Sequence, residues 1–343
     1  FTLPGEPFAG LVRRVTVTNA GDEPLDLEML DGLARVMPYG VDNGSLKEIG
    51  RTIEAWMAVL NLEERLPFYH FRASVGDTAE VQEIRAGHFY LAFDAAGRRL
   101  PAFVDPVVVF RQNTALSAPD GFLARPLAEL GRQRQITTGR TPCGFFGTEA
   151  SLEPGQAVTL YAIVGHAGSL EQIRRAAGRL AQPAYVAAKR QEAEDLVDRL
   201  TAVVATHTAS RRFDAYVRQT FLDNVLRGGW PLLLGDAKSP AVYHVYSRKH
   251  GDLERDYNYF SLAAEPYSQG NANYRDVNQN RRCDVLFQPE IGAFNVLSFL
   301  RCRPSAAPPS WPWWSSPGHW RRCWPGPSPP ANSCGPSPTE RWS

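Results

Sequence analysis

Short runs in which hydrophobic and polar residues alternate dominate the first half of the chain and predict β-strands. The segment 11–18 is rich in β-branched residues, and Leu25, Leu27 and Met29 alternate with acidic residues as in a half-buried strand. Similar patterns predict strands at 68–74, 88–93, 106–110 and 157–164. Many short strands with frequent Gly and Pro between them favour a β-sandwich over residues 1–166. A helix over 45–62 is expected between two of the strands.

From Ser169 onwards the hydrophobic period becomes helical. Leu170, Ile173, Ala177 and Leu180 recur at helical spacing, and Ser169 has the side chain expected of an N-cap. Two further helices are predicted, one from Pro183 to about residue 204 and one over 213–228 that ends near a pair of glycines. Residues 167–206 are therefore interpreted as a helical linker that leads into a helical domain.

Residues 235–300 mix polar residues with large aromatic ones. Asp, Asn and Arg suit sugar hydroxyls, and aromatic rings suit the apolar faces of sugars, so this composition indicates a carbohydrate site. The alternative interpretation is a long surface loop.

The last segment, residues 301–343, differs in composition from the rest. It holds most of the eight tryptophans among prolines, serines and arginines, and it shows neither helical nor strand periodicity. We expect this tail to be the product of a frameshift and not a native sugar platform or membrane anchor; a genuine Pro-rich ligand tail is the alternative.

Composition and charge exclude some classes of partner. The 343 residues carry 37 basic and 36 acidic side chains, so nothing favours nucleic acid or an anionic membrane as a partner. There is no apolar run long enough for a transmembrane helix. Five irregularly spaced cysteines without a CxxC pair argue against disulfides or zinc and favour a cytoplasmic location. Because the first residue is Phe1 and not Met, we expect the chain to begin inside a longer reading frame.

Two blocks of sequence, 244–260 and 267–282, carry a family resemblance. Tyr274-Arg275-Asp276 followed by Asn278-Gln279 resembles the phosphorylases of glycoside hydrolase family 94 and the related β-1,3-glucan phosphorylases. Two further motifs also resemble sequences of this family: Asp31-Gly32-Leu33 and Met37-Pro38-Tyr39-Gly40. The resemblance covers about residues 1–300 and implies an α+β multidomain protein: a β-sandwich (1–166), a helical linker (167–206) and the start of an incomplete (α/α)6 barrel (207–300).

The resemblance implies a set of substrate-binding residues. Asp276 would hold hydroxyls of the non-reducing sugar, a role that suits a carboxylate because its charge-assisted hydrogen bonds are strong. Arg275 would orient Asp276 or hold another hydroxyl, and the other candidates are Tyr274, Gln279 and Arg248. The alternatives are structural ion pairs, Arg275 with Asp276 and Arg248 with Asp256. For His244 and His250, contact with sugar or phosphate competes with a packing or surface role.

The activity implied by the resemblance is phosphorolysis of β-glucosides or β-glucan oligosaccharides with inversion, which yields α-glucose 1-phosphate. Phosphate is the co-substrate and attacks without a base, and no metal or organic cofactor is implied. The general acid of the family lies beyond the in-frame sequence, so the catalytic residue is unknown and the chain as written is expected to be inactive. Gly270 and Asn280 stand where the cellobiose enzymes carry Arg and Asp, which favours another linkage such as β-1,3.

The expected partners are a β-linked gluco-oligosaccharide, phosphate and, because relatives often pair through the sandwich, a second copy of the chain. Two other functions stay open. One is a non-catalytic carbohydrate-binding or structural remnant, and the other is an inverting β-glycosidase, which would need a second catalytic carboxylate.

Overall fold

The computed structural model describes residues 1–41, 43–73, 83–228, 230–235, 241–244, 282 and 284–301. These residues fall into two compact units, Phe1–Ala202 and the part from Val203 onwards. Each unit is described by itself.

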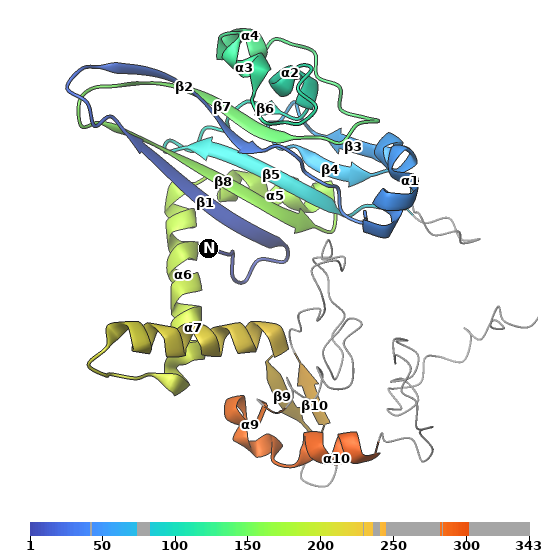
Figure 1. The fold of residues 1–343 in the computed structure, drawn as a ribbon, viewed down its shortest axis with the longest axis vertical. Helices are drawn as coiled ribbons and strands as arrows, with labels where there is room; N and C mark the ends of the chain where they lie inside the picture. Colours follow the sequence, from blue (N-terminus) through green and yellow to red (C-terminus); the bar gives the residue numbers. More distant parts are fainter. Residues whose placement is uncertain are drawn as a thin grey trace, which may run out of the picture. The chain divides into compact units, whose positions relative to one another are not determined.

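The larger sheet of the first unit has five antiparallel strands in the order β1-β8-β5-β4-β3 (Figure 1). These strands are β1 (Ala9–Thr18), β8 (Ala157–Ala167), β5 (Gly87–Asp94), β4 (Phe68–Phe71) and β3 (Met57–Leu60). Strands β1 and β8 pair along their whole length, from Ala9 opposite His166 to Thr18 opposite Ala157. The strands predicted at 11–18, 88–93 and 157–164 are confirmed.

A smaller sheet lies against the first. Its strands are β2 (Leu25–Leu33), β7 (Gly144–Leu152) and β6 (Ala102–Phe103), in the order β2-β7-β6. Side chains from both sheets form one hydrophobic core, with Phe146 and Ala102 from the smaller sheet and Tyr90, Ala92 and Leu160 from the larger. Because successive side chains in a strand alternate between its faces, each sheet also presents an outer face.

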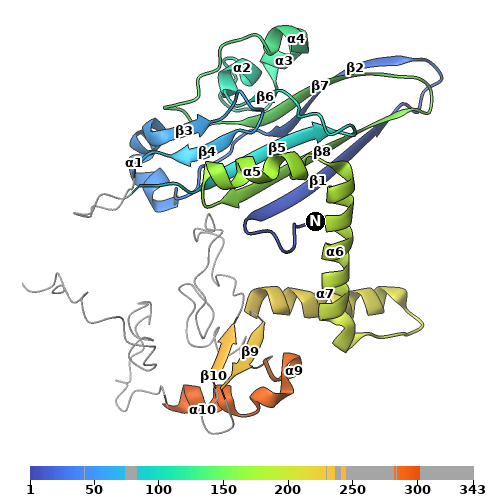
Figure 2. The ribbon, with the colours of Figure 1, turned by 180° about the vertical axis from the view of Figure 1, so that it is seen from behind.

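The outer face of the five-stranded sheet is covered by α5 (Leu170–Leu180), which is followed by α6 (Pro183–Thr201) (Figure 2). Phe89, Phe93 and Ile163 of the sheet meet Ile173 and Leu180 of the helix in a second core. Ser169 caps α5 by accepting a hydrogen bond from the Gln172 amide at 3.2 Å, as predicted. The helix predicted at Pro183 is also confirmed.

Three short helices cover the outer face of the smaller sheet (Figure 1). They are α2 (Pro106–Phe110), α3 (Asp120–Leu123) and α4 (Leu127–Leu130), and they share a core with Phe103 and Phe145. The strand predicted at 106–110 is therefore wrong. Asp105 caps this segment and Pro106 occupies the first turn, where its missing N–H and fixed φ favour a helix.

The helix predicted over 45–62 is also shorter than expected. Helix α1 (Asn43–Trp56) gives way to β3, in which Met57, Ala58 and Val59 are buried. This strand pairs with β4, with Met57 opposite Phe71 and Leu60 opposite Phe68. Pairing with the next strand along the chain therefore overrides the helical pattern of the local sequence.

The second unit contains α7 (Arg211–Gly228), which confirms the helix predicted to end near Gly228. A two-stranded antiparallel sheet follows, made of β9 (Pro231–Leu234) and β10 (Ala241–His244). Helix α9 (Asp284–Phe287), a 3-10 turn at Pro289–Ile291 and α10 (Phe294–Arg301) complete the described residues. The Phe287 ring contacts those of Phe221 and Trp230, with ring centroids 5.0 and 5.8 Å away.

The fold is thus of mixed α and β content, with antiparallel sheets and two units. The helices described in the second unit do not close a barrel. The start of an (α/α)6 barrel therefore stays a prediction.

Candidate functional site

The sugar-binding residues predicted from the sequence lie outside the described part of the chain. This holds for Arg248, Tyr274, Arg275, Asp276 and Gln279, and also for His250 and residues 302–343 of the tail. The backbone of His244 is described as the last residue of β10.

One of the familial motifs, Met37-Pro38-Tyr39-Gly40, meets two histidines of the larger sheet. The Tyr39 ring lies 4.2 Å from the His166 ring and 5.9 Å from the His88 ring, between centroids. The two imidazoles are 5.8 Å apart and nearly perpendicular. Tyr39, His88 and His166 form a compact group, called here the histidine–tyrosine cluster.

Strand register creates the histidine pair. His88 of β5 stands directly opposite His166 of β8. His88 shares its face of the strand with Tyr90 and Ala92, which belong to the core between the two sheets. The cluster therefore lies on the inner face of the larger sheet. Its tyrosine comes from Met37–Gly40, which follows strand β2 of the smaller sheet.

Burial keeps these imidazoles neutral near pH 7. His88 is 6% exposed, and this burial lowers its pKa from 6.5 to about 4, with a smaller contribution from the nearby His166. His88 Nδ1 lies 2.8 Å from the Met37 carbonyl oxygen, which can only accept, so Nδ1 carries the proton and donates. Burial also lowers the pKa of His166 and that of His70, which lies on the opposite face of the sheet.

The cluster offers a phenol and two neutral imidazoles, groups that can both donate and accept hydrogen bonds. Such groups can hydrogen-bond to hydroxyls, but an imidazole whose pKa is lowered to about 4 is a weak base near pH 7. Among the described residues, no group of three His, Cys, Asp or Glu side chains is arranged to hold a metal ion.

The other familial motif, Asp31-Gly32-Leu33, is at the end of β2 and has structural roles. Asp31 forms an ion pair with Arg13 of β1. Gly32 lies so close to β7 that a Cβ there would be 2.0 Å from the carbonyl oxygen of Gly144. The glycine is needed because any side chain would separate the two strands.

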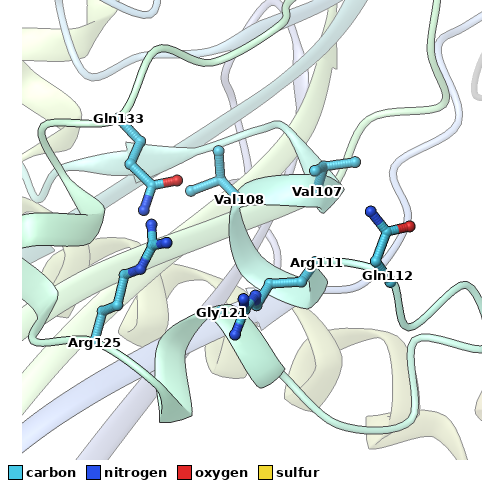
Figure 3. Close-up of a pocket in the computed structure, with 7 residues that line it drawn as sticks. All are labelled: Val107, Val108, Arg111, Gln112, Gly121, Arg125 and Gln133. Atoms are coloured by element: carbon cyan, nitrogen blue, oxygen red, sulfur yellow. The ribbon is translucent and has the colours of Figure 1, made fainter.

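A separate pocket of about 240 Å³ lies among the short helices α2 and α3 and the segment that follows them (Figure 3). Its polar lining comes from Arg111, Gln112, Arg125 and Gln133, and its buried lining includes Val108 and Gly121. The side chains of Arg125 and Gln133 point toward each other.

Sequence reasoning missed both groups. His88 and His166 each lie in an apolar strand and are separated by an even number of residues from side chains that face the core. Because alternate residues of a strand face the same side, this spacing was the available signal. The arginines of the pocket had no comparable signal, because Arg111 and Arg125 lie outside the periodic segments and meet only through the approach of α3 to α2.

The chain matches no protein-family model, and no curated protein matches it either. Within the described ranges, none of the helices has the length and apolar character needed to cross a membrane.

Proposed function

We propose that this chain is the N-terminal part of an inverting glycoside phosphorylase that acts on β-glucosides or β-glucan oligosaccharides. The order of the elements carries the proposal: antiparallel sheets up to Ala167, helices α5 and α6, and then α7, which precedes the two sequence blocks that resemble such enzymes. The resemblance implies a sandwich followed by a helical linker, which agrees with this order, and α7 would begin the proposed barrel.

In the proposed reaction, phosphate attacks the anomeric carbon from the face opposite the glycosidic oxygen. The C–O bond to the leaving sugar breaks, a general acid protonates that oxygen, and inversion gives α-glucose 1-phosphate. The Asp276 carboxylate would accept hydrogen bonds from two hydroxyls of the glucosyl ring. Arg275 would hold this carboxylate in place, with Tyr274, Gln279 and Arg248 around the same sugar. We assign no residue of this chain as the general acid, and the proposal requires no metal or organic cofactor.

Binding of β-1,3- and β-1,4-linked gluco-oligosaccharides, measured by isothermal titration calorimetry, tests the proposal. Hydrogen bonds to a charged group contribute about 1.5–3 kcal/mol each, so Asp276→Asn should weaken binding at least about tenfold. Asp120→Asn is the matched control, because Asp120 is an exposed acid in the first turn of α3. Equal affinity in the two variants, or no binding of any oligosaccharide to the unsubstituted chain, would contradict the assignment of Asp276.

Product analysis separates the phosphorylase from the alternatives. The chain is incubated with the oligosaccharide that it binds and with phosphate, and free glucose and glucose 1-phosphate are measured. Glucose 1-phosphate indicates a phosphorylase, and glucose formed without phosphate indicates a glycosidase. Binding without either product is the behaviour of a carbohydrate-binding module or of a part that needs the remainder of the enzyme.

A further inference from the structure

The pocket beside α2 and α3 is lined by groups that donate hydrogen bonds to anions. Two guanidiniums, from Arg111 and Arg125, and two carboxamides, from Gln112 and Gln133, form its polar lining, and none of the described residues that line it is a carboxylate. Figure 3 shows the Arg111 side chain reaching over α3 near Gly121, on the side where Arg125 and Gln133 face each other, whereas Gln112 lies on the other side of Arg111. The pocket has the chemistry of a site for a negatively charged group.

No described residue neutralises either guanidinium. Neither Arg111 nor Arg125 forms an ion pair with a described residue, although eight other arginines of the first unit do so. Arg140 is an instructive contrast nearby, since it donates to Asp105 at 2.6 Å. The two positive charges at the pocket are therefore available to a ligand.

The backbone holds Arg111 in an unfavourable conformation. Its φ of 52° and ψ of −119°, at the C-cap of α2, lie in a region that non-glycine residues rarely adopt. Strain of this kind persists only where surrounding structure enforces it, and it concentrates at ligand sites. A second feature of the pocket is the glycine at position 121 in α3, where a Cβ would lie 2.1 Å from the carbonyl oxygen of Val108. That glycine lets α3 approach α2 closely enough to form the buried side of the pocket.

We propose that this pocket binds a small tetrahedral oxyanion, namely phosphate or the phosphate group of a monoester. A volume of about 240 Å³ is below the range of about 300–1,000 Å³ that is usual for drug-sized ligands. Two guanidiniums from different elements can each donate two hydrogen bonds to a tetrahedral anion, because its several oxygens can serve both forks at once. The proposal is independent of the phosphorylase activity and of the residues that would bind the sugar.

Calorimetric titrations with inorganic phosphate and with glucose 1-phosphate, at constant ionic strength, test the site. The double substitution R111Q/R125Q should weaken binding at least tenfold. The control R132Q/R134Q removes two positive charges from exposed arginines of the same segment that do not line the pocket, and it should change the affinity less than twofold. Tighter binding of the free anion or of the ester identifies the source of the phosphate group, and either result supports the site.

A second variant keeps the test decisive if the double substitution disturbs folding. Arg111→Gly removes the backbone strain and one guanidinium together, so it should raise the melting temperature while it weakens phosphate binding. The proposal is overturned if neither ligand binds, if R111Q/R125Q and R132Q/R134Q reduce binding equally, or if binding survives R111Q/R125Q unchanged. The last result would place the phosphate elsewhere in the chain.

Discussion

The buried imidazole of His88 should make the stability of the first unit depend on pH. Burial lowers its folded-state pKa to about 4, whereas the unfolded chain has the ordinary value near 6.5. Between these two values the unfolded state binds a proton that the folded state does not bind. The contribution of His88 is therefore fully present above pH 6.5 and is lost as the pH falls toward 4.

The size of this effect follows from the two pKa values. One pKa unit corresponds to about 1.4 kcal/mol, so the fall from 6.5 to about 4 corresponds to about 3 kcal/mol of unfolding free energy. His166 and His70 add to the loss in the same direction, because burial lowers the pKa of each of them as well.

Urea unfolding followed by circular dichroism, at several pH values from 7.5 to 4.5 (a range set by these pKa values), measures the effect. The test variant is His88→Asn, whose amide nitrogen occupies about the position of Nδ1 and can still donate to the Met37 carbonyl. Carboxylates titrate equally in both proteins, so the difference between the two pH profiles isolates His88. We expect that difference to reach about 2–3 kcal/mol between pH 7 and 4.5.

His207→Asn is the control, because His207 is exposed and belongs to the second unit. Its profile should follow that of the unsubstituted chain. If the profile of His88→Asn also runs parallel to that of the unsubstituted chain, burial of a neutral His88 does not contribute as reasoned here.

Three further substitutions test the elements that support the two sites. Asp105→Ala should lower the free energy of urea unfolding by about 3–5 kcal/mol, because this buried carboxylate accepts hydrogen bonds from the amides of Val107 and Ile136 and from Arg140. The exposed control Asp120→Asn should change that free energy by less than about 0.5 kcal/mol. Ser169→Ala should cost about 1 kcal/mol and Ser169→Gly only a few tenths, read from amide hydrogen exchange in α5, and equal costs would contradict the capping role. Gly121→Ala should lower the unfolding free energy by about 1–3 kcal/mol and weaken phosphate binding. The control is Gly131→Ala, where the nearest atom to a Cβ would be the Leu127 carbonyl oxygen at 3.5 Å. It should leave both the unfolding free energy and the calorimetric affinity nearly unchanged.

Local sequence predicted those elements whose signals are local. Helix α5 has both a visible period and a visible cap, and β1 has a long β-branched run, so both were identified correctly. The run at Pro106–Phe110 is short and wholly apolar, and such a run fits a buried strand as well as a buried helix. Met57–Leu60 becomes a strand because it pairs with β4, the next strand along the chain, and this pairing outweighs the helical pattern of its own residues.

The candidate sites were less predictable because they depend on distant pairings. The motif Met37–Gly40 was noticed in the sequence, but its partners His88 and His166 meet only through the register of β5 with β8. Likewise, Arg111 and Arg125 share one pocket only because Gly121 allows α3 to approach α2 closely. Register and close approach are properties of the assembled fold and have no local sequence pattern.

The charged groups around α2 have two kinds of role. Asp105 stabilises the fold, whereas Arg111 and Arg125 have no ion-pair partner among the described residues. Asp105 is 2% exposed, caps α2 and ties it to the segment 136–140, while Gln135 bonds to the Ala102 carbonyl and the Val104 amide. These buried contacts fix both the helix that ends at Arg111 and the segment that carries Gln133. Arg111 itself is exposed, unpaired among the described residues and strained in its backbone, so it contributes nothing comparable to folding. Backbone strain at Arg111, beside a second arginine that has no ion-pair partner among the described residues, favours the proposed ligand site over a role in folding.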